Sequence, residues 1–164
     1  MPDRLVIAIP EPFPDTSFDA VDDRFELRQG RAGASLSEDE LIRFLEGADA
    51  AAIYSRDHYT RRVFAALPRL RVLAKGGSNP TSNVDLDAAK AHGVQVSWTP
   101  GANAVSVAEM AIALMLTVLR RFPELTQRLQ DGGWRDFDLL GHEMAGCTLG
   151  LVGFGVIGRE VAKR

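Results

Sequence analysis

Cysteine is almost absent from this sequence of 164 residues, which contains only Cys147. A single cysteine cannot close an internal disulfide, and it excludes a metal site built from cysteine thiolates at the usual spacing. The sequence therefore predicts no metal site. A chain without disulfides suits a reducing compartment, so we expect a cytoplasmic protein.

An excess of positive charge is also missing, because 19 Lys and Arg face 22 Asp and Glu and leave a net charge of -3. Without a positive field we expect neither nucleic acid nor an anionic membrane as a partner.

The longest apolar run, residues 104–119, contains three polar residues and falls short of the roughly 20 residues that span a bilayer. We expect a buried helix there. Residues 5–9 are too short an apolar run for a secretory signal, which predicts a chain that is mature from Met1.

Short β-branched or aliphatic runs alternate with helical stretches along the chain. This alternation predicts an α/β fold in which helices cover a parallel sheet. The expected strands are residues 5–9, 25–28, 50–54, 70–74, 94–98 and 148–152. The composition changes after residue 98, where a turn-rich joint covers residues 99–103, so we expect one domain over residues 1–99 and the start of another over residues 100–164.

Helix ends are signalled by polar residues and glycine. Ser37 and Glu40 form a capping-box pattern for a helix that Gly47 ends, and Thr60 is placed to cap a helix that runs to residue 66. Asp85 and Asp87 suit the first turn of a helix that ends at residues 92–93. Further helices are expected over residues 104–119, over residues 123–130 and from residue 156 onward.

A GxGxxG motif directly follows the last expected strand and opens the last expected helix. The first glycine permits a tight turn, the second lets a pyrophosphate approach the backbone, and the third lets helix and strand pack. The motif predicts a dinucleotide site, although such a turn can also bind nothing. An acidic residue roughly 20 residues further on would select NAD over NADP, and this sequence does not contain it, so both cofactors stay open. The expected cofactor-binding residues are Gly153, Phe154, Gly155, Val156, Ile157 and Gly158.

Three stretches, residues 83–96, 99–109 and 141–159, resemble the N-terminal half of the D-isomer-specific 2-hydroxyacid dehydrogenases, the phosphoglycerate dehydrogenase-like family. The resemblance implies a flavodoxin-like substrate domain with a parallel sheet, followed by the start of a Rossmann dinucleotide-binding domain, and an active site in the cleft between two such domains. It also places Val107 where family members touch the nicotinamide, although packing within the helix is an equal alternative. Glu109 in the same helix is expected to be structural and to need either a partner or water beside it, because an unpaired buried carboxylate is costly.

The substrate loop of the family corresponds to a glycine-containing segment at the carboxyl end of an expected strand, where open α/β sheets bind ligands. Backbone N–H groups there can face a carboxylate, and Lys75 would add positive charge; a plain connecting loop is the alternative. The segment differs from the GxGxDN-like run that is commoner in the family. The expected substrate-binding residues are Lys75, Gly76, Gly77, Ser78 and Asn79.

The resemblance implies an NAD(P)-dependent oxidoreductase that acts on the CH–OH group of a D-2-hydroxy acid, or reduces a 2-oxo acid in reverse. We also expect a homodimer, because the apolar helix over residues 104–119 needs a partner subunit to cover it. The family's catalytic arginine, glutamate and histidine lie beyond the glycine-rich turn. No residue of this sequence inherits those roles, and His58, His92 and His142 are not substitutes. We therefore expect residues 1–164 alone to be inactive. The alternative is a non-catalytic ligand-binding or interaction module.

Overall fold

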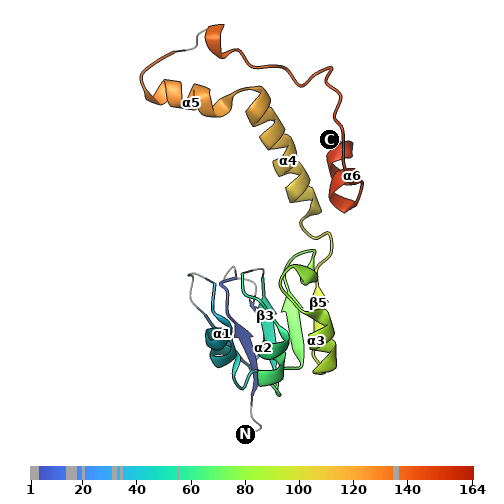
Figure 1. Cartoon of the computed structure of the whole chain (residues 1–164). Coiled ribbons are helices and arrows are strands. Elements are labelled where there is room, and N and C mark those ends of the chain that lie inside the picture. The colour runs from blue at the N-terminus through green and yellow to red at the C-terminus, as the bar shows by residue number, and fades with distance from the viewer. Residues whose placement is uncertain are drawn as a thin grey trace. The chain divides into compact units, whose positions relative to one another are not determined.

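The computed structural model describes residues 4–13, 18–19, 21–30, 33, 35–54, 56–134 and 137–164. The chain forms two compact units, Met1–Pro100 and Gly101–Arg164, which are described separately below (Figure 1). Among the residues that the structure describes, no helix combines the length and the apolar character needed to cross a membrane.

The first unit is built on a parallel sheet with the strand order β2-β1-β3-β4-β5. Its strands are β1 (Leu5–Ile9), β2 (Phe25–Gln29), β3 (Ala50–Ile53), β4 (Val72–Lys75) and β5 (Gln95–Trp98). This is the flavodoxin-like order, in which the chain reverses direction across the sheet between β1 and β3. The predicted fold class and these five predicted strands are confirmed.

Helices α1 (Glu38–Leu45), α2 (Arg61–Ala66) and α3 (Leu86–Ala91) connect the strands from β2 onward (Figure 1). The predicted capping box of α1 is confirmed: the Glu40 N–H donates to the Ser37 hydroxyl oxygen, and the Glu40 carboxylate accepts from the Ser37 N–H at 2.9 Å. Asp85 caps α3 by accepting from the Ala88 N–H at 2.9 Å.

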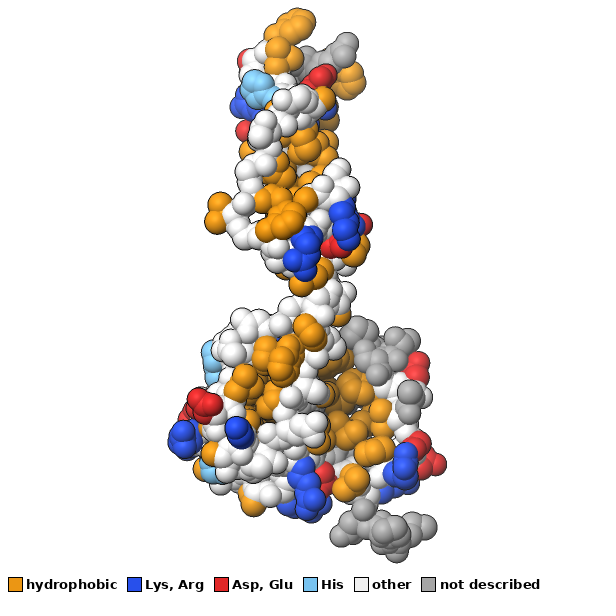
Figure 2. Space-filling view, turned by 90° about the vertical axis from the view of Figure 1, so that its right-hand side faces the viewer, with side chains coloured by type: hydrophobic (Ala, Val, Ile, Leu, Met, Phe, Trp, Pro, Cys, Tyr) orange, Lys and Arg blue, Asp and Glu red, His pale blue; other side chains and the backbone are white. Residues whose placement is uncertain are grey.

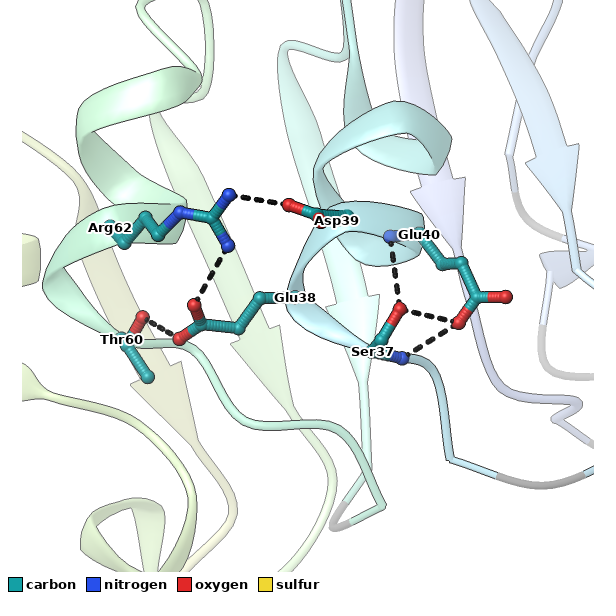
Figure 3. Close-up of polar contacts among 6 residues, drawn as sticks. All are labelled: Ser37, Glu38, Asp39, Glu40, Thr60 and Arg62. Atoms are coloured by element: carbon teal, nitrogen blue, oxygen red, sulfur yellow. Dashed lines mark hydrogen bonds and ion pairs between the residues drawn. The ribbon is translucent and has the colours of Figure 1, made fainter.

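The predicted cap of α2 is wrong in its chemistry. Thr60 occupies the N-cap position, but its hydroxyl makes no capping hydrogen bond and instead donates to a carboxylate oxygen of Glu38 at 2.5 Å. The other Glu38 oxygen accepts from Arg62, whose guanidinium also bonds Asp39 (Figure 3). Thr60 therefore ties α2 to the first turn of α1 instead of capping its own helix.

Alternate residues of the strands face a core between the sheet and the helices. In β4, Leu73 and Lys75 are buried while Val72 and Ala74 are exposed, as the two-residue period of a strand requires. The largest buried apolar side chains of this core are Tyr59, Phe64, Leu41, Leu45, Ile53, Leu73 and Val63.

The second unit consists of α4 (Ala104–Leu119), α5 (Phe122–Gln130) and α6 (Val156–Lys163), with a 3-10 turn at Phe137–Leu139. The predicted extents of the three helices are confirmed. Helix α4 contacts both α5 and α6. The segment between α5 and α6 contains this 3-10 turn, and its residues 135–136 lie outside the described residues.

Two predictions for this unit are wrong. Helix α4 is not buried: only Ala104 and Ala108 of its residues are, and apolar side chains appear on the surface of the unit in Figure 2. Residues 148–152 form no strand. A strand exists only when a neighbour accepts its hydrogen bonds, and the described residues place no strand beside this segment.

Candidate functional site

The buried polar and charged residues that the structure describes gather near the carboxyl ends of β1, β3 and β4. They are Glu11, Asp57, Lys75 and Asn83. These three strands are neighbours in the sheet, and β1 and β3 flank the reversal of strand order, where open α/β sheets place ligands. The predicted loop of residues 75–79 begins at the same edge.

Lys75 ends β4 and is only 4% exposed. Its ammonium donates to the carbonyl oxygen of Tyr54 at 2.6 Å and to Oδ1 of Asn83 at 2.6 Å. Burial lowers the pKa of Lys75, and the negative charge of Glu11 opposes that shift. The Lys75 charge therefore points into the protein, next to the loop rather than into it.

The glycines of the loop already make hydrogen bonds. The Gly76 N–H donates to the Ile53 carbonyl oxygen at 2.8 Å, and the Gly77 N–H donates to Oγ1 of Thr99 at 3.0 Å. Gly77 has φ +111°, a backbone conformation that side chains with a Cβ rarely adopt. A bound carboxylate would have to replace the Thr99 hydroxyl as the acceptor at Gly77.

The end of the loop is shaped by an asparagine cap. Oδ1 of Asn79 accepts from the N–H and the hydroxyl of Thr81, at 3.0 and 2.7 Å, and opens a 3-10 turn at Pro80–Ser82. Ser78 and Asn79 are both exposed. The structure thus brings the five predicted substrate-binding residues into one turn, with Lys75 buried at its start.

Sequence reasoning missed Glu11, Asp57 and Asn83. The Glu11 carboxylate accepts from the N–H groups of Tyr54 and Arg56 at 3.3 and 3.0 Å. Nδ2 of Asn83 donates to the Asp57 carbonyl oxygen at 2.7 Å. A charged residue close to the carboxyl end of a strand, as Glu11 lies two positions after the last residue of β1, is the signal that could have identified this group.

Asp57 and Tyr59 complete the buried group. The Asp57 carboxylate accepts from the Leu36 N–H at 2.7 Å and from the Ser35 hydroxyl at 3.0 Å. The buried Tyr59 hydroxyl has no hydrogen-bond partner among the described residues, and burial together with the charges of Asp57 and Glu11 raises its pKa well above the usual value. The Asp57 carboxylate is therefore held by a backbone amide and a serine hydroxyl.

The glycine-rich turn of the second unit has the local geometry that its motif requires. Gly153 has φ +92°. A Cβ on Gly158 would lie 2.5 Å from the Gly153 carbonyl oxygen, so the third glycine permits the close packing of turn and helix. Gly155 caps α6, and a Cβ there would meet nothing within 4 Å. The open space at Gly155 fits the approach of a pyrophosphate to the backbone.

The remaining predicted cofactor residues lie on the surface of the second unit. Phe154, Val156 and Ile157 of the turn are exposed, as is Val107 in the first turn of α4. The Glu109 carboxylate accepts from the Arg164 guanidinium at 3.1 Å, but Glu109 is exposed, so burial does not require this partner. All three histidines, His58, His92 and His142, are exposed as well.

Comparison with known proteins identifies relatives for almost the whole chain. The family model described as "D-isomer specific 2-hydroxyacid dehydrogenase, catalytic domain" matches residues 7–158. Hydroxypyruvate reductase of Thermotoga maritima is 41% identical over 129 residues, which are 79% of this chain and 42% of that protein. Human D-3-phosphoglycerate dehydrogenase is 37% identical over 130 residues, which are 79% of this chain and 24% of that protein.

Solved structures agree with these relatives. The apo-structure of D-lactate dehydrogenase from Escherichia coli has a TM-score of 0.78 and 29% identity over 97% of this chain and 51% of that one. D-lactate dehydrogenase from Aquifex aeolicus, complexed with NAD and lactic acid, has a TM-score of 0.76 and 25% identity over 96% of this chain and 47% of that one. The chain spans about half the length of these structures and less than half of the two curated relatives.

Proposed function

Because the chain belongs to the D-isomer specific 2-hydroxyacid dehydrogenase family, we propose that it is the N-terminal part of an NAD(P)-dependent oxidoreductase that acts on the CH–OH group of a D-2-hydroxy acid. In the reverse direction the substrate is a 2-oxo acid. The observation that carries the proposal is the glycine-rich turn, where Gly153 and Gly158 shape the backbone and Gly155 leaves room for a ligand.

In this proposal the first unit binds the substrate and the second unit binds the cofactor. Residues 76–79 of the first unit bind the substrate carboxylate beside the buried Lys75, with Thr99 giving up its bond to Gly77. Residues 153–158 of the second unit hold the pyrophosphate of NAD or NADP at the start of α6, and Val107 lies against the nicotinamide. When bound, the cofactor accepts the hydride that leaves the carbon bearing the substrate hydroxyl.

This chain contributes binding groups and no catalytic ones. The family resemblance places the catalytic arginine, glutamate and histidine after the glycine-rich turn, and losing such a unit together removes most of the rate acceleration. We expect purified residues 1–164 to reduce neither NAD nor NADP in the presence of a D-2-hydroxy acid. Protein-dependent formation of the reduced cofactor, followed by its absorbance, would contradict this.

A direct binding experiment tests the cofactor site. We expect NAD at millimolar concentrations to shift the NMR signals of the amides of residues 153–158. A Gly155→Ala variant should lose at least tenfold in affinity, on the order of the cost of one obstructed contact, because its methyl group would occupy the space left for the pyrophosphate. Since that Cβ meets nothing and φ at Gly155 is -77°, the turn itself should keep its fold.

Gly150→Ala is the matched control, because a Cβ there also meets nothing within 4 Å and the residue lies outside the turn. It should bind NAD as the wild type does. Equal affinity of the wild type and the Gly155→Ala variant would show that the turn is not the cofactor site. In that case the non-catalytic interaction module would become the better description of the chain.

We further propose a cytoplasmic homodimer. The exposed free thiol of Cys147 supports a reducing compartment. The exposed apolar side chains of α4 support association, since a soluble protein seldom leaves a large apolar surface uncovered.

A further inference from the structure

Lys75 and Glu11 hold the two peptide groups on either side of the Tyr54 Cα, directly after β3. The Lys75 ammonium donates to the Tyr54 carbonyl oxygen at 2.6 Å, and the Glu11 carboxylate accepts from the Tyr54 N–H at 3.3 Å. Glu11 also accepts from the N–H of Arg56 at 3.0 Å. Two opposite charges, one at the end of β4 and one just after β1, therefore fix the segment that lies between them.

Tyr54 connects this charged pair to the substrate loop. A Cβ on Gly76 would lie 2.8 Å from Cε2 of the Tyr54 ring, so the ring lies directly against Gly76. The carbonyl oxygen of Ile53, the residue before Tyr54, accepts from the Gly76 N–H at 2.8 Å. The position of residues 53–54 thus determines where the first amide of the loop lies.

Both charges are removed from solvent. Lys75 is 4% exposed and Glu11 is 6% exposed, so water and salt screen them little. Asn83 accepts a second hydrogen bond from the Lys75 ammonium at 2.6 Å, which keeps that ammonium directed into the protein. The loop glycines follow Lys75 directly in the sequence, and they therefore lie within the field of the pair.

We propose that Lys75 and Glu11 are positioning residues, which set the affinity of residues 76–79 for the carboxylate of a 2-hydroxy acid without contacting it. The inference rests on the proposed function, because it assumes that this loop binds the substrate. Lys75 favours the bound anion and Glu11 opposes it. Each acts through the field at the loop and through its own hydrogen bond to the backbone of Tyr54.

The test compares a charged ligand with a neutral ligand of the same shape. D-lactate and D-lactamide are titrated separately into residues 1–164, and affinities are taken from the NMR signals of the amides of residues 76–79. A Lys75→Met variant should bind D-lactate about tenfold more weakly, the size expected for one unit charge acting through protein at a few atom diameters. Its affinity for D-lactamide should stay within twofold of wild type.

Lys90→Met is the matched control, since it removes the same charge from an exposed position on α3 and should change neither affinity. If the role of Lys75 is purely structural, the Lys75→Met variant should bind D-lactate and D-lactamide more weakly by the same factor. That result would overturn the proposal. So would equal D-lactate affinity of the wild type and the Lys75→Met variant.

A Glu11→Gln variant should change the affinity for D-lactate in the opposite direction. It tests the proposal even if the Lys75→Met variant does not fold. Glutamine keeps the acceptor oxygen for Tyr54 and Arg56 but removes the negative charge. D-lactate should then bind severalfold more tightly, with D-lactamide unchanged; unchanged D-lactate affinity overturns the inference. If D-lactate shifts no amide signal of residues 76–79 in the wild type, these residues do not bind the substrate and the proposed function is wrong at this point. If D-lactate does shift them, the variants test only the roles of Lys75 and Glu11.

Discussion

Asp49 shows how one residue joins two strands of the sheet. Its carboxylate accepts from the Val6 N–H at 2.9 Å, in β1, and pairs with the Arg69 guanidinium at 3.0 Å. Burial by itself would raise the pKa of Asp49, but the Val6 N–H and Arg69 together outweigh it and hold the pKa below its usual value. The charged form is therefore the one that the folded protein stabilises.

Replacing Asp49 by Ala should lower the free energy of unfolding at pH 7 by about 1–3 kcal/mol, the cost of a lost hydrogen bond to a charged acceptor. A carboxyl whose pKa is lower in the folded state contributes stability above its unfolded pKa and loses it as the pH falls through the folded pKa. The difference between variant and wild type should therefore shrink between pH 5 and pH 3 in urea unfolding. An Asp23→Ala variant, at an exposed position, should match wild type at both pH values.

The sequence predicts the positions of the candidate site better than the directions of its side chains. The glycines at residues 76–77 indicate a ligand loop at the end of a strand, and the structure places them there. Its place directly after the expected strand predicted that Lys75 belongs to the loop, although the two-residue period of β4 puts it on the buried face with Leu73. Glu11 was missed because its role depends on the neighbouring strand, β3, which is far away in the sequence.

At the scale of elements, local signals were sufficient wherever a helix could form from its own residues. The capping box at Ser37 predicted α1, and the apolar run predicted the extent of α4. Residues 148–152 have the composition of a strand, but composition carries no information about whether a partner strand is present. The burial of α4 could not be predicted for the same reason, since covering a helix needs another element.

Hydrogen exchange should separate these two segments. Strand β4 pairs with β3 on one side and β5 on the other, so its amides should exchange slowly. The amides of residues 148–152 make no sheet hydrogen bonds in the structure and should exchange orders of magnitude faster, close to the rate of an unprotected chain. Equal protection in the two segments, measured by NMR, would mean that residues 148–152 pair with something in solution.

At the scale of the whole molecule, one face of α4 carries a stripe of exposed apolar side chains. Met110, Leu114 and Val118 are 60%, 57% and 75% exposed. They are spaced four residues apart, and such residues lie on one face of a helix. This α4 stripe is the surface that the proposed homodimer would cover.

Residues 1–164 should therefore self-associate at micromolar concentration, as measured by light scattering. A double variant with Leu114→Glu and Val118→Glu should be monomeric, because burying two carboxylates in an apolar interface is costly. A Leu140→Glu variant is the control: this leucine is equally exposed but lies outside α4. Dissociation of the control to the same extent, or a wild type that is already monomeric, would show that the α4 stripe is not the interface.

The division of the chain at Pro100 affects how the protein is made. All five strands and the three helices that connect them belong to one uninterrupted segment, Met1–Pro100. Domains generally fold as units during synthesis, beginning with the N-terminal one. The parallel sheet, with Lys75 and Glu11 already buried at its edge, can therefore form once β5 has left the ribosome, while the residues of the glycine-rich turn are still being added.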